Sequence, residues 1–275
     1  MSALHDLEPG NHRLICGCCA RGPKDWTLGV TVNHEGAAVG HCFRCGHVET
    51  YRPERGNSYR PGKAISRPVA SFKRETLSEY GTELLGGCTA LHGTIGEAYL
   101  LARGCVIPPD DSDLRFHPNL RHPAIDYAGP ALVALVTHAA TRVPLTLHRT
   151  WIRADGRKAD IEPPRMLLGG HSKRGGVIRL WPDESVTTGL AVTEGCETAL
   201  SLAHDYAPVW SAIDAGNLAA LPVLDGVEVL VIGADHDAAG IKGATACADR
   251  WAAAGVDVRV IAPATGDWND ARAAA

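Results

Sequence analysis

The clearest regularity in the chain is an alternation of short apolar runs and helical stretches in its last third. Four apolar runs have the length of strands, at 189–193, 208–213, 227–233 and 256–262. Three helical stretches lie between them, at 196–205, 216–221 and 238–254. Short strands that alternate with helices are typical of an open, mainly parallel α/β sheet, which is therefore predicted for this region.

The middle of the chain, residues 75–180, has a mixed pattern. Helical spacing occurs at 75–85 and 93–104, and Gly104 is suited to end the second helix because glycine readily adopts the conformation of a C-cap. Residues 130–159 have the pattern of two strands joined by a turn, followed by a third strand. A mixed α+β region is predicted here.

Residues 51–74, which precede this region, have no apolar periodicity. They are rich in Arg, Pro, Gly and Ser, a composition that is typical of flexible linkers. The positive charge of this stretch would also suit contact with nucleic acid, although a simple tether is the preferred interpretation.

Length and composition limit the class of protein. A chain of 275 residues is long enough for two or three domains, and a hydrophobic fraction of 45% is sufficient for a real core. No apolar run approaches the roughly 20 residues of a transmembrane helix, and the first residues have no signal-peptide pattern. We therefore expect a soluble cytoplasmic protein with no membrane partner.

The net charge of −4 conceals a strong asymmetry along the chain. Residues 115–179 hold eleven Lys and Arg against four Asp and Glu, whereas residues 183–275 hold four against fourteen. The remaining residues, 1–114, are nearly balanced. A basic block beside an acidic block suggests a polyanion on one side and cations on the other, although either block alone could be solvated surface.

Two closely spaced cysteine pairs occur near the N-terminus. Cys16 and Cys19 form the first C-x₂-C pair, Cys42 and Cys45 form the second, and 22 residues separate them. Two apolar stretches between the pairs, joined by residues 33–36, have the pattern of a hairpin that could bring the pairs together. This spacing predicts a tetrahedral, structural zinc site, because each pair directs two thiolates towards one ion.

The ligand set leaves alternatives open. Cys18 could replace Cys19, and His41 or His47 could replace a thiolate. Small buried cysteines without a metal are a further possibility. Zinc ribbons bind both nucleic acids and proteins, so the site by itself does not define a function.

Acidic residues follow two of the predicted strands in the last third. Glu194 comes directly after the first strand, and Asp235 and Asp237 follow the third. If these strands are neighbours, the three carboxylates converge at one edge of the sheet, where they would repel one another. A hard cation such as Mg²⁺ removes that repulsion, so a magnesium site is predicted, with small residues after Asp237 leaving space for a phosphate.

A further acidic group, Asp267 and Asp270, follows the last predicted strand and is expected at the same edge. An Asp-x-Asp pair often caps a helix instead of binding a metal, and this alternative applies to Asp235 and Asp237. The combination with Glu194 and with the Asp267 segment favours metal.

The stretches TEGCETAL and ADHDAAG resemble the Toprim domain of primases, topoisomerases and some nucleases, over roughly residues 186–275. The cysteine pairs, with CFRCG, resemble the zinc ribbon of phage and bacterial primases, and DWND also recurs in that group. The order of segments resembles a primase of the phage or plasmid type. It implies a zinc ribbon (1–50), a basic linker (51–74), an N-terminal basic subdomain of the polymerase core (75–185) and a Toprim domain (186–275).

This resemblance implies roles for the carboxylates. Glu194 would be an acid/base or metal-proximal group, and Asp235 and Asp237, with Asp270, would hold the Mg²⁺ ions that bind nucleoside triphosphates, with Mn²⁺ as an alternative ion. Many relatives carry an Asp four residues after the glutamate. Here that position is Thr198, so whether Glu197 substitutes for it is left open.

Cations of the basic segment would hold the template and the triphosphate in such an enzyme. Arg149, Lys158 and Arg165 are the preferred candidates because they lie on or beside predicted strands. Lys173 and Arg174 lie in a glycine-flanked loop and are either a phosphate clamp or solvated surface.

The predicted function is therefore a DNA primase that makes short RNA primers on single-stranded DNA. No G-x₄-G-K-[ST] motif occurs, so a replicative helicase is expected on a separate chain. Two alternatives remain: a Toprim-type nuclease that cuts DNA without nucleotides, and a non-catalytic zinc-ribbon adaptor that binds DNA. A topoisomerase is disfavoured because the chain leaves little space for the gate that carries its tyrosine.

Overall fold

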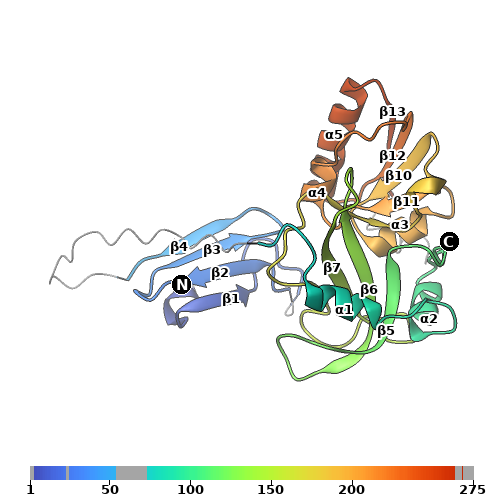
Figure 1. Cartoon of the computed structure of the whole chain (residues 1–275). Helices are drawn as coiled ribbons and strands as arrows, with labels where there is room; N and C mark the ends of the chain where they lie inside the picture. Colours follow the sequence, from blue (N-terminus) through green and yellow to red (C-terminus); the bar gives the residue numbers. More distant parts are fainter. Residues whose placement is uncertain (1–2, 23–24, 54–72, 264–267, 269–275) are drawn as a thin grey trace. The chain divides into compact units, whose positions relative to one another are not determined.

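The structure, a computed structural model, describes residues 3–22, 25–53, 73–263 and 268 (Figure 1). The chain forms two compact units, residues 1–68 and 69–275. Most of the predicted linker, and both Asp267 and Asp270, lie outside the described residues. In the described part of the chain, no helix has the length and apolar character needed to cross a bilayer.

The N-terminal unit is a four-stranded antiparallel sheet in the order β1-β2-β3-β4. Its elements are a short 3₁₀ helix, η1 (Ala3–Asp6), and the strands β1 (Gly10–Leu14), β2 (Leu28–Val32), β3 (Ala38–Cys42) and β4 (Val48–Tyr51). The predicted hairpin between the cysteine pairs is confirmed as β2 and β3. Its turn is stabilised by Asn33, whose Oδ1 accepts hydrogen bonds from the backbone N–H groups of Glu35 and Ala37.

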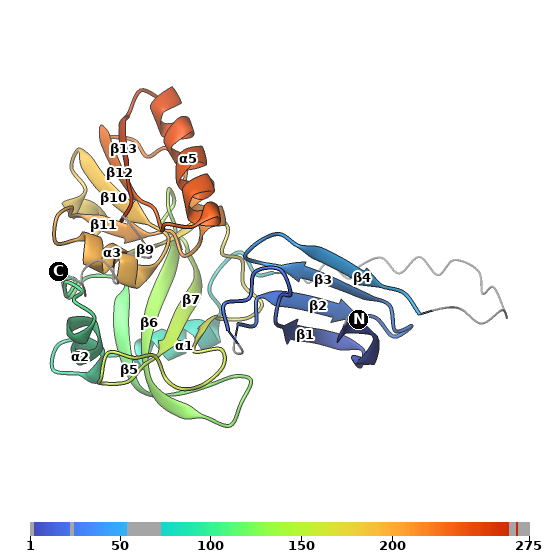
Figure 2. The same ribbon diagram turned by 180° about the vertical axis from the view of Figure 1, so that it is seen from behind.

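The second unit is built on one nine-stranded sheet with helices on both faces (Figures 1 and 2). Its first half contains α1 (Glu79–Gly86), α2 (Ile95–Ala102), β5 (Leu114–Arg121), β6 (Ala128–His138), β7 (Pro144–Trp151), β8 (Arg165–Leu167) and β9 (Gly176–Arg179). Its second half contains η2 (Asp183–Ser185), β10 (Gly189–Thr193), α3 (Cys196–Leu202), β11 (Val209–Ser211), α4 (Ala215–Ala219), β12 (Val229–Gly233), α5 (Ala238–Ala253) and β13 (Asp257–Ile261).

The alternation predicted for the last third is confirmed, because each of its four strands and three helices overlaps a predicted stretch. The strands β13, β12, β10 and β11 are mutually parallel. Beyond them the sheet becomes antiparallel, since β9 pairs with β11 and continues through β6, β7 and β8, while β5 pairs with β6. The basic region and the C-terminal region therefore share one mixed sheet.

One strand prediction in the basic region was wrong. The pattern at 130–159 was expected to form a third strand after the first two, but β7 runs on to Trp151, and only an isolated bridge joins Ile152 to Lys158 beyond it. The polar residues of β7 do not interrupt the strand: Thr146 and Arg149, for example, are buried and donate hydrogen bonds to the backbone carbonyls of Leu168 and Leu167. Gly104 does follow the second helix, with φ +66°, and its N–H bonds to Leu101.

Alternate residues of the parallel strands face two separate cores. On one face, Ala191 and Val231 pack with α2 and α3, and on the other, Val192 and Ile232 pack with α4 and α5. The period of two along each strand produces this division. Both faces of β10 and β12 are thus covered, which fixes the positions where their carboxyl ends leave the sheet.

Candidate functional site

The acidic residues lie where two neighbouring parallel strands end. β10 and β12 pair in register, with Thr193 opposite Gly233, so Glu194 and Asp235 leave the sheet at the same edge. Asp237 begins α5, and its Oδ1 accepts hydrogen bonds from the backbone N–H groups of Ala239 (3.0 Å) and Gly240 (2.8 Å). The capping role weighed for the Asp-x-Asp pair therefore applies to Asp237, although the cap uses only one carboxylate oxygen.

The chain must pass very close to Asp235 to begin α5. An ideal Cβ built on Gly240 would lie 2.8 Å from the carbonyl oxygen of Asp235, closer than real Cβ atoms approach. The glycine lets the first turn of α5 pack directly on Asp235, two residues after the end of β12. Gly240 thus serves helix packing at the acidic edge, whereas Ala238 and Ala239 are exposed.

Glu194 lies in an unfavourable electrostatic environment at this edge. Burial raises its pKa to about 7, with further contributions from the negative charges of Asp235, Asp237 and Asp214. Asp214 was not identified from the sequence, because it follows the short strand β11 as an ordinary helix cap. A cation would relieve this repulsion, so the donor set fits a hard metal ion such as Mg²⁺.

The carboxylates form a loose group. In the described part of the chain, only the four cysteines bring three or more ligand atoms within 4.8 Å of one another. Glu194, Asp235 and Asp237 would therefore share an ion together with water or phosphate oxygens, which is how Mg²⁺ is usually bound.

Asp214 joins this edge to the glycine-flanked loop that was singled out in the sequence. Its carboxylate caps α4 by accepting from the N–H of Asn217 and forms an ion pair with Lys173. Asn217 in turn donates to the backbone carbonyls of Lys173 (2.7 Å) and Gly176 (3.1 Å). Ile213, just before Asp214, has φ +74°, an unusual conformation for a β-branched residue.

A cleft of about 180 Å³ opens beside the carboxylates. Its lining combines cations from the basic region with acidic, small and apolar residues of the C-terminal region. Its lining is Arg103, Lys158, Arg165, Glu194, Gly195, Glu197, Thr198, Ile213 and Asp235. The arrangement suits an anionic group held between fixed cations and a metal-binding edge.

The predicted cations are distributed unevenly around this cleft. Lys158 and Arg165 line it, together with Arg103, which the sequence did not single out because it ends a helix. Arg149 does not line it: only 3% of this residue is exposed, its guanidinium donates to the carbonyl of Leu167, and it lies over the ring of Trp151. Arg174 lines a different cavity, of about 560 Å³.

The cysteine pairs meet at one end of the N-terminal sheet. The Sγ atoms of Cys16 and Cys45 are 3.7 Å apart, and those of Cys19 and Cys42 are 3.5 Å apart. Four thiolates about 2.3 Å from a tetrahedral zinc ion are separated by about 3.8 Å, so the residues fit this metal. Cys18 is exposed and His41 packs edge-on against Phe43, and neither belongs to the cluster.

One face of the N-terminal sheet carries an exposed aromatic side chain. Phe43 is 62% exposed, its ring lies over Gly29, and the guanidinium of Arg13 is 4.4 Å from the ring centroid.

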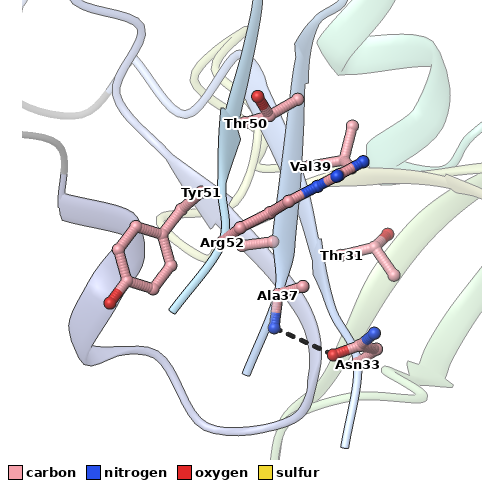
Figure 3. Close-up of a pocket in the computed structure, with 8 residues that line it drawn as sticks. Thr31, Asn33, Ala37, Val39, Thr50, Tyr51 and Arg52 are labelled. Atoms are coloured by element: carbon pink, nitrogen blue, oxygen red, sulfur yellow. Dashed lines mark hydrogen bonds between the residues drawn. The ribbon is translucent and has the colours of Figure 1, made fainter. Parts of the chain in front are cut away.

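A shallow groove of about 530 Å³ lies on this sheet near β3 and β4. Figure 3 shows the side chain of Arg52 reaching towards Val39 in this groove, while Tyr51 points away. The sequence did not indicate this surface.

Two parts of the chain match family models. Residues 189–275 match the model described as a Toprim domain, and residues 75–180 match a domain of unknown function, DUF7146. The C-terminal region is thus a Toprim domain, as its motifs indicated. The chain combines this domain with an N-terminal four-cysteine cluster of the zinc-ribbon type.

Several solved structures resemble the chain at low sequence identity. A DNA primase domain from Pseudomonas aeruginosa is 14% identical, with a TM-score of 0.46, over 71% of this chain and 74% of that one. The primase fragment of the bacteriophage T7 primase-helicase protein is 15% identical, with a TM-score of 0.42, over 96% and 94%. The Aquifex aeolicus primase is 14% identical, with a TM-score of 0.46, over 98% and 78%. No curated protein matches the sequence.

Proposed function

We propose that the protein is a DNA primase that joins ribonucleotides into short primers on single-stranded DNA. The cleft of the second unit supports this most directly, because carboxylates of the Toprim domain and cations of the basic region line the same small space. Nucleotidyl transfer requires both groups: cations to hold phosphates, and carboxylates to hold the metal ions that act on them.

The carboxylates are proposed to hold the metal. Glu194, Asp235 and Asp237 would bind Mg²⁺, or Mn²⁺ in its place, and Asp270, outside the described residues, is a further proposed ligand. When bound, the metal would polarise the reacting phosphate and stabilise the leaving pyrophosphate. Because Glu194 has a pKa raised to about 7, it can also accept or release a proton near neutral pH when the metal is absent.

The cations are proposed to bind the nucleotide. Lys158 and Arg165 would hold the triphosphate within the cleft, and Arg103 lies in the same lining. Lys173, which is held by Asp214, would add a cation at the acidic edge. Arg149 is buried, lies over the ring of Trp151 and donates to the carbonyl of Leu167, and so its proposed contact with nucleotide or DNA has the least support. Arg174 lines a separate cavity, where it would contact the template.

The zinc ribbon is proposed to bind the single-stranded template. Zinc would be structural, because the thiolate cluster closes an otherwise small core. The exposed ring of Phe43 offers a platform on which a base can stack, and Arg13 beside it can contact a phosphate. A separate replicative helicase as partner and a cytoplasmic location stay predictions from the sequence.

Primer synthesis tests this function directly. We expect wild-type protein, single-stranded templates, labelled ribonucleotides and Mg²⁺ to produce short RNA, and Asp235→Ala to produce none. Asp225→Asn, which alters an exposed carboxylate outside the cleft, is the control and should leave synthesis intact. Degradation of the DNA without nucleotides would replace the primase with a nuclease. Intact DNA and no primers, with retained DNA binding, would favour the adaptor.

A further inference from the structure

Glu197 is a buried acid in the wall of the cleft. It lies in the first turn of α3, three residues after Glu194, and is only 6% exposed. Burial opposes its ionisation, but Arg165 and Lys158 hold the pKa of this carboxyl well below its usual range. Glu197 is therefore a charged group at neutral pH, and a buried charge requires partners.

The partners of Glu197 come from the other half of the unit. The hydroxyl of Tyr99, on α2, donates a hydrogen bond to Oε1 at 3.0 Å. The ammonium of Lys158, between β7 and β8, lies 3.7 Å from the same oxygen. Tyr99 and Lys158 belong to the region that matches the domain of unknown function, whereas Glu197 belongs to the Toprim domain. One carboxylate thus connects the two regions.

Lys158 and Arg165 line the cleft together with Glu194 and Asp235. Two cations in one small cleft repel each other, and long side chains lose entropy when they are held in place. Glu197 offsets both effects: its Oε1 lies 3.7 Å from the ammonium of Lys158 and is held by Tyr99, and its negative charge also attracts Arg165, which lines the same cleft. The cations are then oriented before a ligand arrives, which lowers the entropic cost of binding.

We propose that Glu197 is a positioning residue that holds Lys158 and Arg165 for the triphosphate of the incoming nucleotide, and that it does not bind magnesium. The assignment rests on the proposed function, because it concerns the same cleft. This assignment also agrees with the contacts of Glu197. Its Oε1 already accepts a hydrogen bond from Tyr99 and lies 3.7 Å from the ammonium of Lys158.

Glu197→Gln is the primary test, because glutamine keeps the shape and an acceptor for Tyr99 but removes the charge. We expect the KM for ribonucleotides to rise about tenfold, the loss expected for a charge-assisted contact, with a smaller change in kcat. The Mg²⁺ concentration that gives half-maximal activity should not change. A metal ligand would behave in the opposite way, with a large shift in the Mg²⁺ requirement.

A binding measurement separates this proposal from primase activity. Inorganic tripolyphosphate, titrated calorimetrically without divalent cations, should bind Glu197→Gln about tenfold more weakly than wild type. The affinity for Mn²⁺, followed by electron paramagnetic resonance, should be the same in both proteins. Wild-type protein that binds tripolyphosphate but makes no primers would refute the primase and leave the assignment of Glu197 standing. Wild-type protein that does not bind tripolyphosphate would overturn the assignment.

Two further variants keep the test decisive if Glu197→Gln does not fold. Tyr99→Phe retains the charge of Glu197 and removes its hydrogen bond, so tripolyphosphate binding should weaken in the same direction by a smaller factor. Lys158→Met should weaken tripolyphosphate binding strongly.

In the double variant Lys158→Met/Tyr99→Phe the loss of tripolyphosphate affinity should be less than the product of the two single effects, because both substitutions act through the same cation. Independent effects, or weaker Mn²⁺ binding in Tyr99→Phe, would overturn the proposal.

Discussion

Lys173 and Asp214 form an ion pair at the acidic edge of the Toprim domain, and the pair joins the loop after β8 to the start of α4. Asp214 is also one of the charges that raise the pKa of Glu194. The loop carries Gly169, Gly170 and Gly175, which allow it to bend, but Asn217 donates hydrogen bonds to the carbonyls of Lys173 and of Gly176, the first residue of β9. Lys173 is therefore held near the carboxylates.

Asp214→Asn should lower the pKa of Glu194. The substitution removes one like charge and releases the ammonium of Lys173, and both changes favour the ionised form of Glu194. The acidic limb of the pH profile for Mg²⁺-dependent primer synthesis should move to lower pH. Asp225→Asn, an exposed acid that is not among the charges acting on Glu194, is the control. A limb that stays in place in Asp214→Asn would show that Glu194 does not control it.

Glu194→Gln should change how stability depends on pH. In the folded protein without metal, Glu194 has a pKa of about 7, above its usual value of 4.5, so the folded state holds a proton that the unfolded state has released. Wild-type stability should therefore fall as the pH rises from about 5 to 8, relative to that of the variant. At pH 8 the variant should have the higher melting temperature, and at pH 5 the two should differ little.

Thermal unfolding at several pH values, without added divalent cations, measures this difference. The comparison with the variant cancels the titration of groups that do not interact with Glu194. Addition of Mg²⁺ at pH 8 should stabilise wild type and have a smaller effect on Glu194→Gln, because a ligand that binds only the folded state raises its stability. Equal pH profiles in the two proteins would mean that Glu194 titrates normally.

Zinc removal should unfold the N-terminal unit and leave the second unit folded. Cys42→Ser deletes one ligand of the cluster, while Cys18→Ser, in an exposed cysteine outside it, is a matched control. We expect one zinc ion per chain in wild type and in Cys18→Ser, and a large loss in Cys42→Ser. Limited proteolysis should then cut residues 1–68 while residues 69–275, a separate compact unit, resist.

Sequence patterns predicted the local features of this protein well. The spacing of Cys16, Cys19, Cys42 and Cys45 is a local constraint, and so is the position of Asp235 after a buried strand. Each of these features depends on a few neighbouring residues, so the sequence alone was sufficient to predict it. The pairing of β10 with β12, which brings Glu194 to the same edge, was only conditional at that stage.

Features that depend on distant contacts could not be predicted in this way. Arg103 and Tyr99 are ordinary residues of an amphipathic helix until the fold places α2 against the Toprim domain. Arg149 was a reasonable candidate as a cation on a strand, but the direction of its side chain depends on β8 and on Trp151. Antiparallel pairing of β9 with β11 joined two regions that the sequence divided.

Gly240→Ala should destabilise the protein even though alanine is the better helix former. Propensity alone favours alanine by about 1 kcal/mol within a helix. The new Cβ would lie 2.8 Å from the carbonyl oxygen of Asp235, and overpacking of this kind costs about 1–3 kcal/mol. Gly86→Ala is the matched control, because this helical glycine has open space around it and should gain stability. Urea unfolding measures both, and Mg²⁺ binding should weaken only in Gly240→Ala.

Phe43→Ala should weaken the binding of single-stranded DNA without unfolding the ribbon. The ring is 62% exposed and lies on the sheet surface over Gly29, so its removal leaves no buried cavity. Loss of one stacked base costs about 1–3 kcal/mol, and the loss should be similar for templates of different sequence. Tyr80→Ala, which removes a ring that is 60% exposed on α1, is the control and should have little effect.

Arg13→Gln should reduce the dependence of binding on salt by about one phosphate contact. Fluorescence anisotropy with zinc-loaded protein measures all three, and unchanged affinity in Phe43→Ala would remove this face from the template site.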